Sequence, residues 1–488
     1  MRGGCARLAQ ALSCWSVAIL VFITLQLYGG RWIAAQPIPL TDTPKFVGTV
    51  RSAGTGLAEE VRPTAMAQTI GSISWDIKGR IQEGFVAATA HIETGKTFAD
   101  KSALDAYLAD RTQRLYNLRL FDEVIVECQD KGWNGTDAAH VIDIVVHLQE
   151  SGTFVVLPGG SDDDVEGLIL KANTLFFDFM GTGGELELGV SRAWPPESPG
   201  ETSGSATLSF PFYIGPIECA SSLESTPTID DEGQSSMRAT ATLDAGLPLF
   251  DGAGRHQLIL VPSVEVNGDW ADTKSLSLSP GLGLQFGRID WVQNRRRGYL
   301  FELTAIGTST EGVGTGLSSL APHYAADGSF HVLIGPNAEL MGKVGLLWNP
   351  WGGDCGLGAT VRGIDASRLS GDAGLYGNCD FWWNLGPFVF SKWLGMSWLR
   401  ILDVEVHAGP FFDAAFARGS SGDAFGSAAG RLSAGLQVQS YALYAKPFYI
   451  YTAIGVDLRA ALATGTVLGV AADGRPIAML TSAVGIRY

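Results

Sequence analysis

The residues whose types could carry chemistry do not form a recognisable catalytic motif. The sequence has no Gly-x-Ser-x-Gly nucleophile turn and no His-Glu-x-x-His zinc motif, and its 7 histidines are scattered. Residues 162–164 (all Asp) with Glu166, and residues 230–232, are acidic runs that suit either divalent-ion binding or a solvated loop. Residues 295–297 (all Arg) could contact lipid headgroups or a partner, or lie in a solvated turn. We therefore expect no catalytic residue, no metal site and no cofactor.

The composition excludes several classes of protein. The chain of 488 residues has 34 Lys+Arg against 50 Asp+Glu, a formal charge of −16, whereas nucleic-acid binders are usually basic. A hydrophobic fraction of 46% excludes a disordered chain. Mean hydropathy is +0.15, yet past the N-terminus there is no run of ~20 apolar residues, which a polytopic helical membrane protein would need. A chain that is apolar on average but lacks apolar blocks is typical of alternating β-strands.

The N-terminus has the order of a secretory signal. Arg2 and Arg7 precede an uncharged stretch over residues 8–30, and small residues follow up to Ala35. This order predicts a signal peptide over residues 1–35, with a retained helical anchor as the alternative. In either case we expect the rest of the chain to be exported.

The 6 cysteines include no Cys-x-x-Cys pair. Cys355 and Cys379 flank one loop and could form a disulfide. Unpaired core cysteines fit the sequence equally well, because a disulfide scaffold would be denser in cysteine.

Residues 69–152 have the pattern of a small α+β domain. Leu104, Leu108 and Leu115 recur at helical spacing, and other stretches have the character of strands. Residues 36–68 show no period and are predicted to be a linker. The expected elements of the domain are a strand at 70–81, helices at 83–92 and 100–118, and strands at 122–128 and 140–148.

From residue 165 to residue 488 apolar residues alternate with small or polar ones. Between residues 275 and 286, for example, Leu and Phe alternate with Ser, Gly and Gln. A tilted transmembrane strand needs about 10 such residues. The sequence therefore predicts a mainly β fold, a transmembrane antiparallel β-barrel for which about 14 candidate strands can be counted.

Two further features favour a membrane barrel. The chain ends with Val484, Ile486 and Tyr488 on one face, an apolar and aromatic ending that is common on the terminal strand of such barrels. Tryptophans gather near expected strand ends, where aromatic girdles lie, although a β-sandwich would hold them in its core. These are Trp291, Trp348, Trp351, Trp382, Trp383, Trp393 and Trp398.

Two short motifs in the barrel region resemble those of a known family. Val361-Arg362-Gly363-Ile364 matches a Val-Arg-Gly-aromatic loop motif except that Ile364 replaces the aromatic residue. Phe411-Phe412-Asp413-Ala414-Ala415 matches Phe-x-Asp-x-Gly except that Ala415 replaces Gly. With the preceding β-α-α-β-β pattern, the chain resembles the outer-membrane assembly superfamily of BamA and TamA, in which one or more POTRA domains precede a bacterial surface antigen barrel. Barrels of this family usually have about 16 strands, so the resemblance extends the expected number to a range of about 14 to 16.

This resemblance implies a location, a function and a pair of site residues. Arg362 would reach the lumen wall and pair with Asp413, and Phe411 would belong to the same strand motif. The protein would lie in the cell outer membrane with its N-terminal domain in the periplasm. It would insert unfolded outer-membrane proteins by strand pairing at the POTRA edge and the barrel seam, and would not be an enzyme. Its partners would be these clients, outer-membrane lipid and periplasmic accessory proteins, but not nucleic acid.

Other functions are compatible with the same features. A porin-like or surface-exposed structural barrel would show the same alternation of strands. A dedicated protein-secretion transporter, such as one of two-partner secretion, would also share the barrel and a periplasmic domain.

Overall fold

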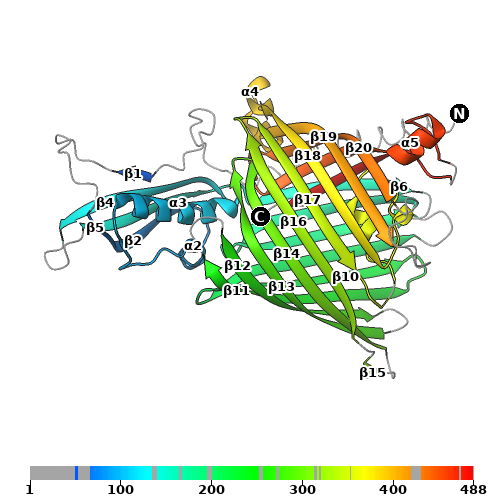
Figure 1. The fold of residues 1–488 in the computed structure, drawn as a ribbon, viewed down its shortest axis with the longest axis horizontal. Helices are drawn as coiled ribbons and strands as arrows, with labels where there is room; N and C mark the ends of the chain where they lie inside the picture. The colour runs from blue at the N-terminus through cyan, green and yellow to red at the C-terminus, as the bar shows by residue number, and fades with distance from the viewer. Residues whose placement is uncertain are drawn as a thin grey trace.

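The structure, a computed structural model, has a small α+β domain joined to a closed β-barrel (Figure 1). It describes residues 50–52, 66–133, 140–163, 167–194, 200–251, 256–270, 274–312, 316–317, 320–351, 353–418, 430–471 and 474–486. The predicted signal peptide and Tyr488 lie outside these residues, as do Asp164 and Glu166. The structural statements below concern the described residues.

The α+β domain is a five-stranded sheet in the order β1-β4-β5-β2-β3. Strands β2 and β5 are parallel, and β5 and β4 are antiparallel. The expected order β-α-α-β-β is therefore confirmed, with two short strands added. The elements are β1 (Val50–Ser52), β2 (Gln68–Lys78), α2 (Glu83–Ala90), β3 (Thr97–Phe98), α3 (Lys101–Asn117), β4 (Phe121–Trp133) and β5 (His140–Glu150).

Helix α3 forms where the sequence supplies both a cap and an apolar stripe. The Asp100 side chain accepts a hydrogen bond from the Ala103 N–H and caps the first turn. Leu104, Leu108 and Leu115 are buried and belong to the same hydrophobic cluster as Val124 and Val126 of β4. This burial of one helical face on one sheet face holds the domain together.

The predicted linker over residues 36–68 needs correction in two places. Val50–Ser52 form β1, which pairs in parallel with β4 through Val126, Glu127 and Cys128. Strand β2 begins at Gln68, at the end of the predicted linker. The sequence did not predict β1 because a strand of three residues is too short to show a period.

Sixteen antiparallel strands form the barrel, which is the upper end of the expected range. The two-residue β15 (Gly316–Leu317) adds to the end of β14. The strands are β6 (Phe154–Asp163), β7 (Gly167–Phe179), β8 (Gly184–Trp194), β9 (Glu201–Ile214), β10 (Ile217–Asp230), β11 (Ser235–Asp251), β12 (Gln257–Trp270), β13 (Lys274–Val292), β14 (Arg295–Gly312), β16 (Ala321–Ile334), β17 (Ala338–Trp348), β18 (Ala373–Phe388), β19 (Val404–Arg418), β20 (Gly430–Ala442), β21 (Phe448–Asp457) and β22 (Ala478–Ile486).

The predicted start of the barrel at residue 165 is too late. Strand β6 precedes that residue and lies between β7 and β22 in the closed sheet, so it forms the barrel's first strand. Its sequence contains Pro158, Gly159 and Gly160, which obscure the alternation on which strand prediction depends.

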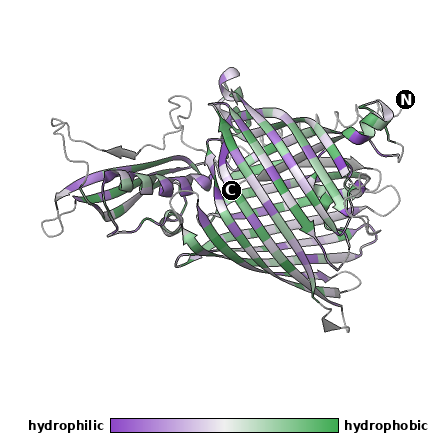
Figure 2. Ribbon diagram, in the orientation of Figure 1, coloured by the Kyte–Doolittle hydropathy of each residue, from purple (hydrophilic) through white to green (hydrophobic). Residues whose placement is uncertain are grey.

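The outer face of the barrel is apolar. On β14, Phe301 and Leu303 are exposed, whereas Glu302 between them faces inward and accepts a hydrogen bond from Gln285 at 2.8 Å. Figure 2 shows hydrophobic residues distributed along the strands rather than gathered in one block. Other exposed outer residues include Leu188, Val190, Leu223, Leu243, Leu282, Val344, Leu436, Ile454 and Leu480. Such a surface fits a lipid environment, because outside a membrane this large apolar band would be exposed to water, which is unfavourable.

The tryptophans divide between the two faces. Trp348, Trp351, Trp383, Trp393 and Trp398 are exposed, as an aromatic girdle requires. Trp291 and Trp382 are buried and correct the prediction that the whole set lies at membrane interfaces. Trp291 lies under the α+β domain, and Trp382 points into the lumen beside Tyr451, with ring centroids 6.3 Å apart.

Cys128, Cys219, Cys355 and Cys379 are free thiols. The disulfide that the sequence left open between Cys355 and Cys379 is not formed, because Cys355 is buried in a loop and Cys379 is exposed on β18. Among the described residues, no helix is long and apolar enough to cross a membrane.

An arginine introduced on β14 should lower the stability of the barrel on the outer face but not on the lumen face. Unboiled protein should migrate faster than boiled protein in a denaturing gel, because the closed hydrogen-bonded sheet resists detergent. Leu303→Arg should lower the stability of this folded band by ~2–4 kcal/mol, as expected for an arginine on the lipid face near the midplane. Thr304→Arg, on the adjacent lumen-facing position, is the matched control and should retain the band. Equal losses in both variants, or no shift in the wild type after refolding, would contradict the assignment of faces.

Candidate functional site

The loop between β17 and β18 folds back into the barrel from the end opposite the α+β domain. It contains two short 3-10 helices, η1 (Leu357–Thr360) and η2 (Ala366–Arg368). Its apolar side chains pack on the inner wall in a small hydrophobic cluster. The cluster consists of Cys355, Leu357, Val361, Ile364, Leu369, Tyr376, Ala415 and Ala417.

The tip of this loop is Val361-Arg362-Gly363-Ile364, as predicted. Gly363 has φ +73°, and a Cβ at this position would collide with the backbone of Gly455 on β21. Two glycines therefore let the loop and the wall touch backbone to backbone. This contact positions the preceding residue, Arg362, against the wall.

The Arg362 guanidinium pairs with Asp413, as the resemblance implied. Its Nε donates to Asp413 Oδ2 at 2.9 Å and its Nη2 to Asp413 Oδ1 at 2.6 Å, a bidentate pair. The Arg362 backbone N–H donates to the same carboxylate at 2.9 Å. Asp413 is fully buried, so its negative charge needs the paired guanidinium to offset the loss of hydration.

Three further wall residues bind the same guanidinium. Nη2 also donates to Asp380 Oδ1 at 2.5 Å, and Nη1 donates to Gln437 Oε1 at 2.7 Å and to the Tyr451 hydroxyl at 3.1 Å. Asp380, Asp413, Gln437 and Tyr451 lie on four consecutive strands, β18 to β21. One side chain thus ties a quarter of the barrel wall together, which the sequence motifs alone did not indicate.

The environment keeps the guanidinium charged. Burial alone would lower the pKa of Arg362, but the hydrogen bonds and charges of Asp413 and Asp380 raise it above its ordinary value. Phe411 also contributes, because the Arg362 Cζ lies 4.2 Å from the centroid of its ring. The Ser433 hydroxyl donates to the Arg362 carbonyl and fixes the loop backbone.

Ile364 takes the position of the aromatic residue in the family motif. It is buried in the loop cluster with Val361 and Leu357. The apolar contact is therefore kept with an aliphatic side chain, and the guanidinium is covered by Phe411 of the wall instead.

A second set of ion pairs anchors the same loop further along. Arg368 Nη1 lies 3.0 Å from Asp457 Oδ2, and both side chains are buried. Arg475 Nη1 lies 3.3 Å from Asp365 Oδ1. Asp457 and Arg475 flank the segment between β21 and β22, so the inward loop is tied to the strand next to the seam.

The predicted terminal-strand residues are placed only in part. In β22, Val484 pairs with Ile450 and Ile486 pairs with Phe448 of β21. Their side chains are not described, and Tyr488 lies outside the described residues.

The α+β domain is docked on the barrel mouth by Arg119, a residue that sequence reasoning missed. Arg119 follows α3, has φ +56° and is buried. Its guanidinium donates to the Lys446 carbonyl at 2.9 Å and 2.5 Å, to the Gln293 carbonyl at 3.1 Å and to Asn294 Oδ1 at 2.6 Å. Its Cζ also lies 4.2 Å from the Trp291 ring centroid. One side chain thereby joins the β13–β14 and β20–β21 turns to the domain.

Lys446 completes this contact from the barrel side. Its Nζ donates to the Phe121 carbonyl at 2.8 Å and to the Asp122 carbonyl at 2.9 Å, and it lies 3.6 Å from Asp122 Oδ1. Burial lowers the pKa of Lys446, and Asp122 opposes this only in part. Leu175, Phe177 and Phe448 of the barrel join the hydrophobic core of the domain, so the two parts share one core.

The charged runs at residues 230–232 and 295–297 have structural partners. Asp230 Oδ1 accepts hydrogen bonds from the Glu232 and Gln234 N–H groups, and Asp231 pairs with Arg192. Arg296 pairs with Glu339 at 3.7 Å and does not face lipid. Within the described part of the chain no group of His, Cys, Asp and Glu could hold a metal ion.

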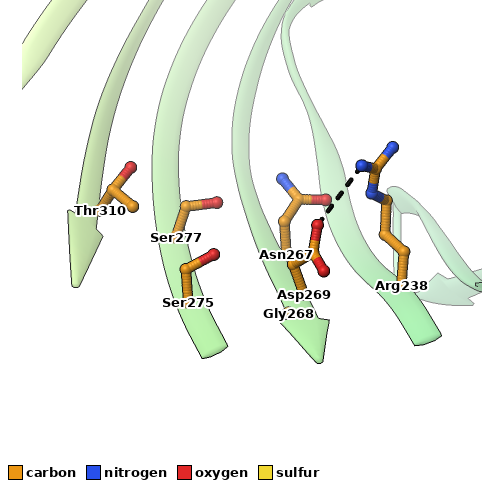
Figure 3. A pocket seen from close by; sticks show the side chains of 7 residues that line it. All are labelled: Arg238, Asn267, Gly268, Asp269, Ser275, Ser277 and Thr310. Carbon is orange, nitrogen blue, oxygen red and sulfur yellow. Dashed lines mark hydrogen bonds and ion pairs between the residues drawn. The ribbon is translucent and has the colours of Figure 1, made fainter. Parts of the chain in front are cut away.

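A polar recess of about 400 Å³ lies at the ends of β11 to β14 (Figure 3). Arg238 and Asp269 form an ion pair of 3.4 Å across it. The remaining lining is short and neutral, and its serine and threonine hydroxyls have no histidine or lysine beside them in the lining that could act as a base. It consists of Asn267, Gly268, Ser275, Ser277 and Thr310.

The Arg362 cluster predicts strong, non-additive energetics. Arg362→Ala leaves the buried Asp413 uncompensated and should lower the free energy of unfolding by roughly 3–5 kcal/mol. Asp413→Ala should have a similar effect, and the double variant should cost clearly less than the sum of both. Urea unfolding in detergent, followed by tryptophan fluorescence, measures this. Arg238→Ala is the control, since its exposed pair with Asp269 should contribute only about 0–1 kcal/mol. Additive single effects would rule out the coupling.

Comparison with known proteins supports this architecture. No family model and no curated protein sequence matches the chain. CdiB from Acinetobacter baumannii is 14% identical with a TM-score of 0.54, over 86% of this chain and 74% of that one. CdiB from Escherichia coli is 13% identical with a TM-score of 0.46, over 99% and 98% of the two chains. BamA from Haemophilus ducreyi lacking POTRA domains 1–3 is 12% identical with a TM-score of 0.43, over 86% and 84%.

At these identities the similarity concerns the fold alone, and only the first of the three TM-scores exceeds 0.5. The sequence motifs had suggested the family of BamA and TamA in particular. That assignment is too specific, because the similar structures include CdiB as well as BamA. The chain has a fold similar to that of CdiB from Acinetobacter baumannii, a closed antiparallel β-barrel preceded by one small α+β domain, which is called the POTRA-like domain below.

Proposed function

We propose that this protein is a non-enzymatic transporter that passes an unfolded polypeptide across the cell outer membrane. Its POTRA-like domain would lie in the periplasm and receive the polypeptide. The observation that carries this proposal is the free edge of β2, which leads to the barrel mouth. The fold similarity to CdiB supports a dedicated secretion transporter over a general assembly factor.

The edge of β2 can accept an additional strand. Strand β3 covers only Gln68 and Thr69 of that edge, and no other described strand pairs with residues 73–78 on that side. Unpaired N–H and C=O groups on an edge pair readily with an extended peptide. An unfolded polypeptide could therefore add to the sheet there without any sequence-specific contact.

The direction of β2 points such a peptide at the barrel. Shortly after β2 ends at Lys78, the Gln82 N–H donates to the Gly181 carbonyl in the β7–β8 turn at 2.7 Å. The Gln82 side chain donates to the Met180 carbonyl at 3.0 Å. A strand bound along β2 would thus extend to the mouth beside β6 and β7.

The inward loop would control the path through the barrel. Arg362 holds it against β18 to β21, which leaves the wall from β7 to β17 free of this loop's main contacts. In this proposal the clamped loop sets the shape of the lumen, and the polypeptide passes along the wall that it leaves open.

Insertion of outer-membrane proteins is the second candidate. It is favoured by the position of the β2 edge near β6, because β6 and β22 form the junction between the first and last strands. A client strand pairing at an opened junction would satisfy backbone groups that lipid cannot. A passive structural barrel gives no role to the free β2 edge.

Depletion in the native host should separate these functions. We expect loss of one exported polypeptide or a small set, with the folded amounts of other outer-membrane barrels unchanged, because a transporter serves a dedicated substrate. Quantitative proteomics of outer membranes and culture medium measures this. A broad fall in folded barrels would instead identify an insertion factor, and no change in either fraction would contradict both.

The β2 edge should contact the substrate directly. A photo-crosslinking amino acid at Ser74, exposed on β2, should capture the transported polypeptide in living cells. Glu127 is the matched control: it lies on the same face of the sheet, but its strand β4 is paired there on both sides, with Arg51 of β1 and Val145 of β5. Equal capture at both positions, or capture only at Glu127, would contradict recognition by strand addition.

A further inference from the structure

The segment between β18 and β19, residues 389–403, differs from the short turns beside it at the same barrel end. It contains α4 (Phe390–Trp393) and the 3-10 helix η3 (Ser397–Leu402). Four of its large apolar side chains are exposed: Trp393 (66%), Leu394 (60%), Met396 (46%) and Trp398 (46%). Exposed apolar groups concentrated in one short segment indicate a contact surface.

The segment holds these side chains outward in a defined conformation. Asp403 is buried and accepts hydrogen bonds from the Ser391 N–H at 2.9 Å and the Ser391 hydroxyl at 2.6 Å, which closes the segment on itself. Leu399 is buried beneath it. The Trp393 ring packs edge-on against Phe388 and Phe390, with centroids 6.0 Å and 5.5 Å away. The exposure is therefore built into the fold.

The exposed patch continues the lipid-facing surface of the barrel. Trp383 and Leu385, on the outer face of β18, are exposed just before the segment begins. Figure 1 shows α4 on the outer rim of the barrel, at the end that carries the POTRA-like domain but away from that domain. A bilayer that covers β18 would reach the segment at its surface.

The charges of the segment match a phospholipid surface. Lys392 is exposed and directly precedes Trp393. Arg400 is also exposed, although it lies within electrostatic range of Asp122 in the POTRA-like domain. The only acidic residue, Asp403, is buried and hydrogen-bonded. Tryptophan with lysine or arginine beside it is typical of segments that lie in the headgroup region.

We propose that residues 389–403 form an interfacial anchor that binds phospholipid on the side of the bilayer facing the POTRA-like domain. Trp393, Leu394, Met396 and Trp398 enter the boundary between headgroups and acyl chains, and Lys392 contacts the phosphates. The anchor fixes the depth and tilt of the barrel at β18 and β19, and with them the height of the docked domain above the membrane.

Spin-label accessibility tests the anchor on the full chain. Leu394→Cys is placed in a variant whose native cysteines are replaced by alanine, labelled, and inserted as single barrels into nanodiscs of phosphatidylethanolamine and phosphatidylglycerol. Asn337→Cys, exposed on the neighbouring β16–β17 turn, is the matched control. The gel shift of unboiled protein verifies that each variant is folded.

We expect the label at 394 to collide several-fold more with oxygen and several-fold less with a water-soluble nickel complex than the label at 337. Trp393→Ser with Trp398→Ser should raise the nickel collisions at 394 while the barrel stays folded. Equal nickel collisions at 394 and 337 would overturn the proposal. Protection of 394 from both reagents would also overturn it, because a protein partner or a second copy of the chain would then cover the segment.

Discussion

The lumen of this barrel depends on one largely buried guanidinium. Arg362 binds Asp380, Asp413, Gln437 and Tyr451, which lie on four successive strands. Without it, two carboxylates would be left close together in a poorly hydrated space, at a cost of several kcal/mol per ion. The loop and the wall therefore stabilise each other: the loop contributes the positive charge of Arg362, and the wall contributes the oxygen atoms that accept its hydrogen bonds. The contact between Gly363 and Gly455 is what permits so close an approach.

Arg119 plays a comparable role at the other end of the barrel. It caps backbone carbonyls of two barrel turns and lies against the Trp291 ring. Because Leu175, Phe177 and Phe448 also enter the core of the POTRA-like domain, the domain is fixed relative to the mouth rather than tethered to it. This fixed placement gives the free edge of β2 a direction, toward the β7–β8 turn, and the proposed delivery of a polypeptide by strand addition depends on that direction.

The outer surface adds a third constraint. An apolar band surrounds the strands, and the segment over residues 389–403 extends that band at one point of the rim. An apolar band around the whole barrel does not fix the direction in which the barrel tilts. An interfacial segment at one point of the rim restricts the tilt, because it holds that point at a set depth. The anchor and the docked domain together would set how the mouth is oriented relative to the bilayer surface.

The sequence by itself determined the two-part organisation, because period-2 alternation and helical spacing are local. It also contained the contiguous motifs Val361-Arg362-Gly363 and Phe411-x-Asp413, from which the family resemblance implied the Arg362–Asp413 pair. It did not reveal β1 or β6, since a three-residue strand and a strand interrupted by Pro158, Gly159 and Gly160 carry no readable period. Nor did it reveal Asp380, Gln437, Tyr451 or Arg119. Each is one polar residue in an unremarkable stretch, and its partner lies tens to hundreds of residues away along the chain. Only closure of the barrel, which brings distant strands into one wall and distant turns onto one rim, decided which of these side chains meet.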